Sequence, residues 1–228
     1  MRLAVIVSDG HGEETQGKSS PVFENDIIIG GVQLKKGERF KENWFNQSVA
    51  DLLFFELVKR NIYVKQLCPE SEDIPLDKRR VIQNKMHDEM VKKGFLPITI
   101  SIHANAHLDG SVWTSAQGVE TFFKNRDKES ERLATLIQEK VIEVRKHYLP
   151  FNQYTNRGVK TANFYVFRNY KGVVVLPEAE FMTNKGTVVL LASKEFQEKV
   201  AKAYADAIEE FQGFKLIGDL DSKTEKKI

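Results

Sequence analysis

An apolar, β-branched run that breaks into small residues at a histidine constrains this chain more than any other feature. The run covers residues 95–102, and His103 follows it directly. Short runs of this composition are typical of buried strands. Residues 3–8 form a similar run, which leads through Gly10 into His11. Ligands of open α/β sheets collect at the carboxyl ends of the strands, so we expect the two histidines to face one crevice.

Patterns for helices and strands alternate along the rest of the chain. Helical spacing of apolar residues predicts helices at 43–60, 75–93, 128–147 and 194–211. Strands are predicted at 3–8, 62–67, 95–102, 118–123, 163–167 and 173–176, with a small hairpin at 26–34 around Gly30-Gly31. This order predicts an α/β single-domain layered fold, in which helices flank a twisted, mostly parallel sheet. We expect one catalytic domain at 1–213 and a polar, disordered tail at 214–228.

Composition excludes several classes of function. A chain of 228 residues forms one domain that buries roughly 70% of its unfolded surface. The net charge of +2, without a basic block among aromatic residues, argues against a nucleic-acid partner. No stretch is long and apolar enough to span a bilayer, so no membrane partner is expected. Met1-Arg2 leads straight into a strand, which predicts a product without a signal peptide that is cytoplasmic when synthesised.

The residue types that remain point to a metal held by histidine and carboxylate. Cys68 is the single cysteine, which excludes a cysteine-rich site, and we expect it to be a packing residue. A catalytic zinc typically takes three protein ligands and keeps one position open. Glu42 is the first candidate for the third ligand, because a carboxylate suits the start of a helix, and Glu24 is its competitor. Glu178 follows a buried run, where a carboxylate outside the ligand set could transfer protons.

Each of these residues also has an ordinary structural interpretation. A histidine at a strand end is often only hydrogen-bonded, and Glu42 could be a solvated first-turn carboxylate. Glu178 could form an ion pair with Lys160 or Arg157. Trp113 follows a turn signal, and it could be a platform for a sugar or peptide or a half-buried anchor.

The motifs, taken in their order, resemble the zinc-dependent N-acetylmuramoyl-L-alanine amidases that cut peptidoglycan. The resemblance runs from about residue 3 to about residue 211. It rests on these segments: 9–12 (Asp-Gly-His-Gly), 42–46, 76–80 with Asn84, 101–106 (Ser-Ile-His-Ala-Asn-Ala), 118–120 with Phe122, 157–160, and 176–178 with Phe181 and Asn184.

The resemblance implies a zinc site and a reaction. His11, Glu42 and His103 would hold Zn²⁺, and Glu178 would be the catalytic carboxylate. Zinc would polarise the amide between N-acetylmuramic acid and L-alanine and activate water, while Glu178 shuttles the proton. We expect contacts to the peptidoglycan substrate from three further residues, Asn105, Trp113 and Lys160. The enzyme is expected to be a monomer that reaches the wall after release, as a phage endolysin does.

Departures from the family pattern leave alternatives open. Glu180 stands where the family often has a small residue, although the offset of three residues to Phe181 favours Glu178 as the catalytic group. The long segment 13–41 leaves the choice between Glu42 and Glu24 open. A catalytically silent peptidoglycan-binding module and a zinc peptidase that cuts the stem peptide are the competing functions. His107 is interpreted as a loop residue near the substrate, and His87 and His147 as surface residues.

Overall fold

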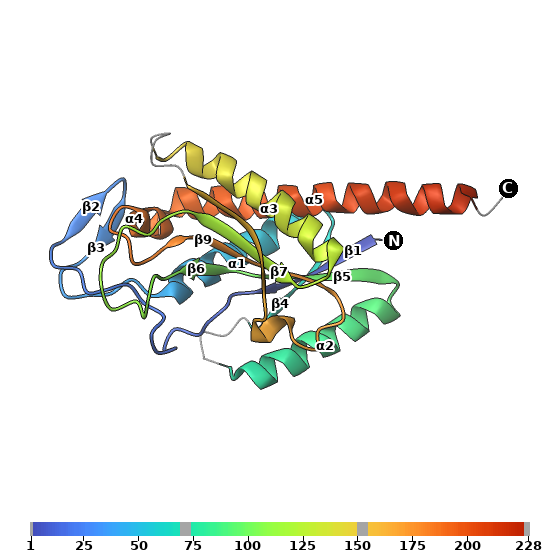
Figure 1. The fold of residues 1–228 in the computed structure, drawn as a ribbon, viewed down its shortest axis with the longest axis horizontal. Coiled ribbons are helices and arrows are strands. Elements are labelled where there is room, and N and C mark those ends of the chain that lie inside the picture. The colour runs from blue at the N-terminus through green and yellow to red at the C-terminus, as the bar shows by residue number, and fades with distance from the viewer. Residues whose placement is uncertain (1, 69–73, 150–154, 226–228) are drawn as a thin grey trace.

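A central sheet of seven strands organises the computed structural model, which describes residues 2–68, 74–149 and 155–225 and, for 215–225, the backbone alone. The strand order is β4-β1-β5-β9-β7-β8, and β6 pairs with β9 (Figure 1). All pairs are parallel except β7 with β9, which confirms the mostly parallel sheet. The strands are β1 (Arg2–Ser8), β4 (Tyr63–Leu67), β5 (Phe95–Ser101), β6 (His103–Asn105), β7 (Val119–Lys124), β8 (Asn156–Ala162) and β9 (Val173–Phe181).

Helices cover both faces of this sheet. In Figure 1, α3 and α5 lie above the strands and α2 lies below them. Alternate residues of β1 explain the arrangement: Leu3, Val5 and Val7 join the main core, whereas Ala4 and Ile6 pack with Met90 of α2. The helices are α1 (Glu42–Lys59), α2 (Leu76–Lys92), α3 (Lys128–Lys146), α4 (Thr187–Ala192) and α5 (Lys194–Glu225), with a 3₁₀ turn, η2 (Tyr165–Phe167).

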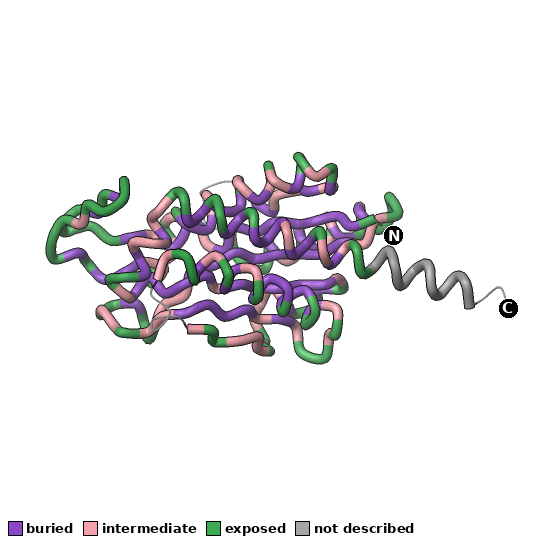
Figure 2. The backbone as a smooth tube through the Cα atoms, turned by 90° about the horizontal axis from the view of Figure 1, so that it is seen from above, coloured by how far each residue is buried: buried purple, intermediate pink, exposed green. Residues whose placement is uncertain are grey.

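Burial follows from these layers. The strands run through the middle of the molecule as buried chain, and exposed residues gather on outer loops and outer helix faces (Figure 2). Because both faces of the sheet are covered, the strands are apolar runs rather than alternating ones. Cys68 is buried beside Ala4 and Ile6, which confirms its interpretation as a packing residue.

The hairpin is confirmed as a separate two-stranded sheet. Its strands are β2 (Ile27–Ile29) and β3 (Val32–Leu34), and they are antiparallel. Gly30 and Gly31 form the turn with φ of 56° and 82°, the left-handed region that favours glycine.

The strand predicted at 163–167 is wrong. That segment contains η2, and the strand is β8, seven residues earlier at Asn156. Phe164 and Phe167 pack into a small separate core with Val174 and Leu176, so their apolar character reflects local packing rather than a sheet position. β8 lies at the sheet edge, where charged residues and glycine are common, and it therefore lacks the apolar signal of a central strand.

Three further boundaries differ from the prediction. The strand expected to end at 176 continues to Phe181, and α4 was not predicted. The last helix continues to Glu225, although a disordered tail was expected from 214; residues 226–228 of that tail lie outside the described residues. Within the described chain, no helix is long and apolar enough to cross a membrane.

His87 is also placed differently from its surface prediction. It lies on the buried side of α2, 9% exposed, with its ring edge-to-face against Tyr170 at 5.4 Å between centroids. His147, by contrast, is exposed at the end of α3, as predicted.

Candidate metal and catalytic site

The loop after β1 brings His11 to the carboxyl edge of the sheet. Gly10 makes the turn with φ of 69°. A Cβ at this position would lie 2.7 Å from the Ile102 carbonyl oxygen and 2.8 Å from Cε1 of His103, so only glycine fits. The side-chain amide of Asn43, on α1, donates to the His11 carbonyl at 2.7 Å and holds the loop against the helix.

The end of β5 places His103 in the same crevice. Its Nδ1 is 2.9 Å from Oε1 of Glu42, and its Nε2 is 3.1 Å from the hydroxyl of Ser101. Hydrogen bonds of this kind fix the orientation of an imidazole ring. The rings of His11 and His103 meet edge-to-face with centroids 5.0 Å apart, so the two strand-end histidines do face one crevice.

Glu42 completes the cluster from the first residue of α1. Its side chain is buried, and its Oε1 accepts hydrogen bonds from Nδ2 of Asn46 at 3.1 Å and from the backbone N–H of Ala104 at 3.4 Å. The ammonium of Lys18 lies 3.8 Å from the other carboxylate oxygen. Glu24, the competing candidate, is exposed and instead pairs with Lys185 at 2.9 Å.

The three side chains form a donor set that suits a divalent metal. His11, Glu42 and His103 each offer one ligand atom, and these atoms all lie within 4.8 Å of one another. Burial and the charge of His103 lower the pKa of His11 to about 3, which leaves its imidazole neutral, the form that binds metals. Burial acts to raise the pKa of Glu42, but the hydrogen bond and charge of His103 outweigh it and lower the pKa to about 2. A carboxylate with two imidazoles matches the ligands of catalytic zinc.

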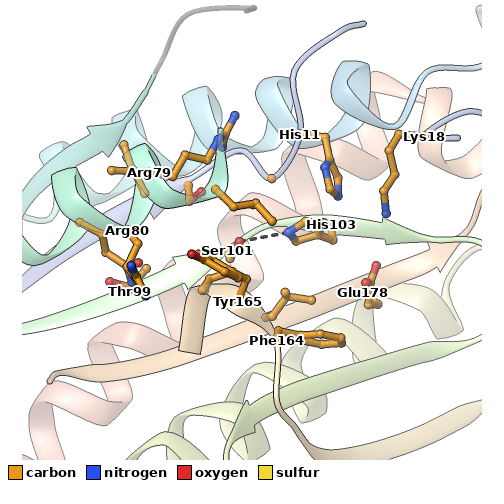
Figure 3. Close-up of a pocket in the computed structure, with 17 residues that line it drawn as sticks. His11, Lys18, Arg79, Arg80, Thr99, Ser101, His103, Phe164, Tyr165 and Glu178 are labelled. Carbon is orange, nitrogen blue, oxygen red and sulfur yellow. Dashed lines mark hydrogen bonds between the residues drawn. The ribbon is translucent and has the colours of Figure 1, made fainter. Parts of the chain in front are cut away.

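Glu178 lies beside this cluster, inside β9 rather than after its end as predicted. It is paired across the sheet with His103 on one side and with Glu120 on the other, and its side chain reaches the cleft near Lys18 (Figure 3). Burial, followed by the charge of Glu42, raises the pKa of Glu178 well above its ordinary value. Its buried Oε2 has no hydrogen-bond partner among the described residues. The alternative interpretation, an ion pair with Lys160 or Arg157, is not supported, because both of these side chains pair with Glu120.

Glu180 is held in a buried ion pair and does not line the cleft. It is fully buried and forms an ion pair with Arg145 of α3, and its other oxygen accepts from the backbone N–H of Gly118 at 2.8 Å. A β-bulge explains why two glutamates spaced by two residues diverge. Between the pairs His103–Glu178 and Asn105–Phe181, β6 advances two residues and β9 three, so the extra residue turns Glu180 away from the cleft.

Lys160 and Arg157 contact a different carboxylate. Both side chains pair with Oε2 of Glu120, and the Asn105 amide donates to Oε1 of the same residue. Burial acts to raise the pKa of Glu120, but the hydrogen bonds from Lys160 and Arg157 outweigh it and hold the pKa below its ordinary value.

A cleft of about 210 Å³ opens at the cluster and extends to α2 and η2. Figure 3 shows His11, His103 and Glu178 at one end of it and Arg79, Arg80 and Tyr165 at the other. A second recess, of about 180 Å³, lies on the other side of Glu178 and includes Asn105.

Trp113, Lys160 and His107 lie outside both recesses, as far as the described residues form them. Trp113 is half-buried, with its ring against Phe23 at 5.3 Å and its indole N–H directed to the Val22 carbonyl, which favours the anchor interpretation. His107 is an exposed loop residue.

Sequence reasoning gave no role to several polar residues that line the cleft, although one of them, Arg79, lies in the 76–80 motif. Lys18 sits in a glycine-containing loop without a recognisable pattern. Arg79 and Gln83 are buried on α2 and are spaced by four residues, so they share one face of the helix. Long polar residues at core-facing positions of an amphipathic helix were the signal available for them.

Comparisons with known proteins agree with this geometry. Residues 5–210 match the family described as N-acetylmuramoyl-L-alanine amidase. An uncharacterised Bacillus subtilis protein, YqiI, is 33% identical over 212 residues, which are 91% of this chain and 84% of the relative. The B. subtilis N-acetylmuramoyl-L-alanine amidase LytC is 39% identical over 110 residues, but these are 47% of this chain and only 20% of LytC.

Solved structures show the same fold. The N-acetylmuramoyl-L-alanine amidase of Clostridium difficile 630 superposes with a TM-score of 0.71 at 22% identity, covering 92% of this chain and 96% of that one. The catalytic domain of the CD27L endolysin, which targets C. difficile, gives 0.60 at 21% identity, covering 92% and 98%.

Together, the layered sheet and the crevice at its carboxyl edge define an α/β-layered protein with a candidate metal centre. More particularly, the chain belongs to the N-acetylmuramoyl-L-alanine amidase family. Peptidoglycan is the substrate that this membership implies.

Proposed function

We propose that this protein hydrolyses the amide between N-acetylmuramic acid and L-alanine with one zinc ion held by His11, Glu42 and His103. The convergence of these three side chains beside Glu178 is the observation that carries the proposal. Bound zinc would supply Lewis acidity for the amide carbonyl and for the attacking water.

The side chains of this chain divide the remaining tasks. Ser101 orients the ring of His103, and Asn46 orients the carboxylate of Glu42. Glu178 takes a proton from the attacking water and delivers one to the leaving amine nitrogen. Burial raises the pKa of Glu178 well above its ordinary value, which favours proton uptake, and a nearby dication would oppose that shift.

Asn105 is the substrate-binding prediction that the geometry supports best. It lines the smaller recess together with Glu178 and Glu42, and its amide is already oriented by Glu120. Substrate contacts by Trp113 and Lys160 remain predictions. Trp113 packs against Phe23 as an anchor, and Lys160 pairs with Glu120, so each also has a structural role.

Release of stem peptide from purified cell wall tests the proposal. New amino groups should appear with the protein, disappear on chelation and return with Zn²⁺. Glu178→Gln should lower the rate about 10²- to 10⁴-fold, the range for loss of general acid–base catalysis, while the bound zinc content stays unchanged. Glu24→Gln, at an exposed carboxylate, is the matched control. Activity that survives chelation would exclude the metal mechanism.

The released fragments distinguish the competing functions. Fragments that begin with L-alanine support the amidase, and cleavage inside the stem would identify a peptidase. Wall binding without any new amino groups would identify a silent module, although the buried ion pair of Glu180 removes one motive for that interpretation. Release through a membrane lesion, as for an endolysin, stays a prediction.

A further inference from the structure

The two recesses beside the candidate metal site meet at Glu178 and Lys18, which line both of them. If the substrate is cut at this point, the parts on the two sides of the scissile bond therefore lie in different recesses. The amide in question joins a neutral sugar unit to a peptide that carries free carboxyl groups. The two recesses differ in their chemistry, so they can be assigned to the two parts.

The recess toward α2 contains buried donors without acceptors. Arg79 uses Nη1 for Asp9 at 3.2 Å and Nε for the Ile74 carbonyl at 3.2 Å, but its Nη2 has no partner among the described residues. Nε2 of Gln83, one helical turn further, is buried and equally unpartnered. Buried N–H donors in proteins are nearly always satisfied, so two such groups on one wall indicate a missing acceptor.

The charges around this recess favour an anionic acceptor. Asp9 neutralises part of the charge of Arg79, Arg80 adds a second cation that lines this recess alone, and Lys18 stands at the junction of the two recesses. Arg80 also contacts the exposed Asp77 at 3.2 Å and lies over the ring of Tyr165. Guanidinium groups are the preferred partners of carboxylates, because their donors match the two oxygens.

The other recess has the opposite character. Its wall beyond the metal cluster consists of Gly17, Ala104, Asn105, Ala106, Leu108 and Asp109. Asp109 accepts hydrogen bonds from Ser111 that lower its pKa, so it is ionised and repels a carboxylate. The small side chains of this recess and the amide of Asn105 suit a neutral, hydroxyl-rich sugar.

We propose that the α2 recess is the stem-peptide subsite, in which Arg79 and Gln83 bind a carboxylate of the peptide, and that the sugar occupies the recess at Asn105. This assignment rests on the proposed amidase function. It fixes the direction in which the substrate crosses the site, with the peptide toward α2 and η2 (Figure 3).

Binding of a small acidic peptide tests the assignment. Calorimetry on the zinc-loaded protein would compare L-Ala-D-Glu with the same dipeptide amidated at both carboxyl groups. We expect the free acid to bind more tightly, and Gln83→Leu to weaken its binding about tenfold or more, as for loss of a hydrogen bond to a charged group. Binding of the diamide should change little. Lys78→Met, at an exposed position of the same helix, is the matched control.

A second variant protects the test against misfolding. Arg79→Lys keeps a cation that can reach Asp9 but removes the planar donor pair, and it should also weaken binding of the acid while the thermal unfolding midpoint stays close to wild type. Preference for the acid that is unchanged in both variants would place the carboxylate elsewhere, such as on the zinc, and would overturn the assignment. Equal affinity for acid and diamide would overturn it too.

The two proposals fail in different ways. Turnover of cell wall with normal dipeptide binding in Gln83→Leu rejects the subsite and keeps the amidase. Carboxylate binding that depends on Gln83, without any turnover, rejects the amidase and leaves a peptide-binding site.

Discussion

At the residue scale, the site depends on which carboxylate meets the two histidines. Glu42 is buried in contact with His103, whereas Glu24 is exposed and lies against Lys185. The sequence alone did not decide between Glu42 and Glu24. The segment 13–41 is long, and its sequence does not show which of the two carboxylates lies beside the strand ends that carry the histidines. His11 and His103 were recognisable because each follows an apolar strand directly.

Exchange of each glutamate separates the two candidates by metal content. Glu42→Gln should remove a charged ligand and lower the zinc bound per protein after dialysis at least tenfold, since loss of a hydrogen bond to a metal ligand alone costs about 10- to 100-fold in metal affinity. Glu24→Gln should retain the full content. Metal analysis by mass spectrometry provides the readout, and a zinc loss confined to the Glu24 variant would reverse the assignment.

At the element scale, charged side chains hold strands that have no clear apolar pattern in the sequence. Glu120 on β7 holds Lys160 of the edge strand β8 and Asn105 of β6. The apolar runs of β1, β5 and β9 were sufficient to predict the centre of the sheet. β8 could not be predicted in this way, because an edge strand is held by its neighbour and by such ion pairs rather than by burial.

The pH dependence of stability should report the Glu120 contacts. The pKa of Glu120 in the folded protein lies below its ordinary 4.5, so its contribution is present above pH 4.5 and is lost as the pH falls through the folded pKa. Glu120→Gln should therefore flatten the decline of unfolding free energy below pH 4.5, as measured by urea titration at a series of pH values. Parallel curves for the two proteins would contradict the prediction.

The ion pair between Glu180 and Arg145 attaches the bulge of β9 to α3. Both side chains are fully buried, so Glu180→Gln removes the carboxylate charge beside the buried guanidinium and should lower the unfolding free energy by about 3–5 kcal/mol. Denaturant unfolding measures this loss. Glu195→Gln, at an exposed pair with Lys199 on α5, should change stability little. An equally small effect at Glu180 would show that the pair is dispensable.

At the scale of the whole molecule, the main core is apolar and contains none of the three candidate metal ligands. The main core runs through β1, β5 and β9 and under α1, α3 and α5. Three separate segments supply His11, Glu42 and His103, so a bound ion would connect the first loop, α1 and β6. The layered fold followed from the alternation of patterns. The shared crevice of the two histidines followed from their strand-end positions, but the full ligand set required the resemblance as well, because no spacing along the chain shows which carboxylate lies beside them.

Removal of metal should consequently lower the thermal midpoint without abolishing folding. Binding at about a hundredfold excess over Kd contributes about 2.7 kcal/mol, which corresponds to a shift of about 5–10 °C for a chain of this size. Differential scanning calorimetry with chelator and with added Zn²⁺ would measure it. Glu42→Gln should show a clearly smaller shift, and a full zinc-dependent shift in that variant would indicate a different binding site.

The bulge in β9 also has a consequence for how this chain tolerates change. Because one extra residue directs Glu178 and Glu180 to opposite sides of the sheet, these two carboxylates, two positions apart, have different neighbours: Glu178 faces the cleft, and Glu180 pairs with Arg145. On the proposed mechanism, we expect a substitution at Glu178 to spare folding and lower turnover, whereas one at Glu180 would act through the amount of folded protein. Deletion of the single residue Ala179 would restore the regular pleat and exchange the sides on which the downstream residues fall, so this strand should tolerate replacements far better than changes in length.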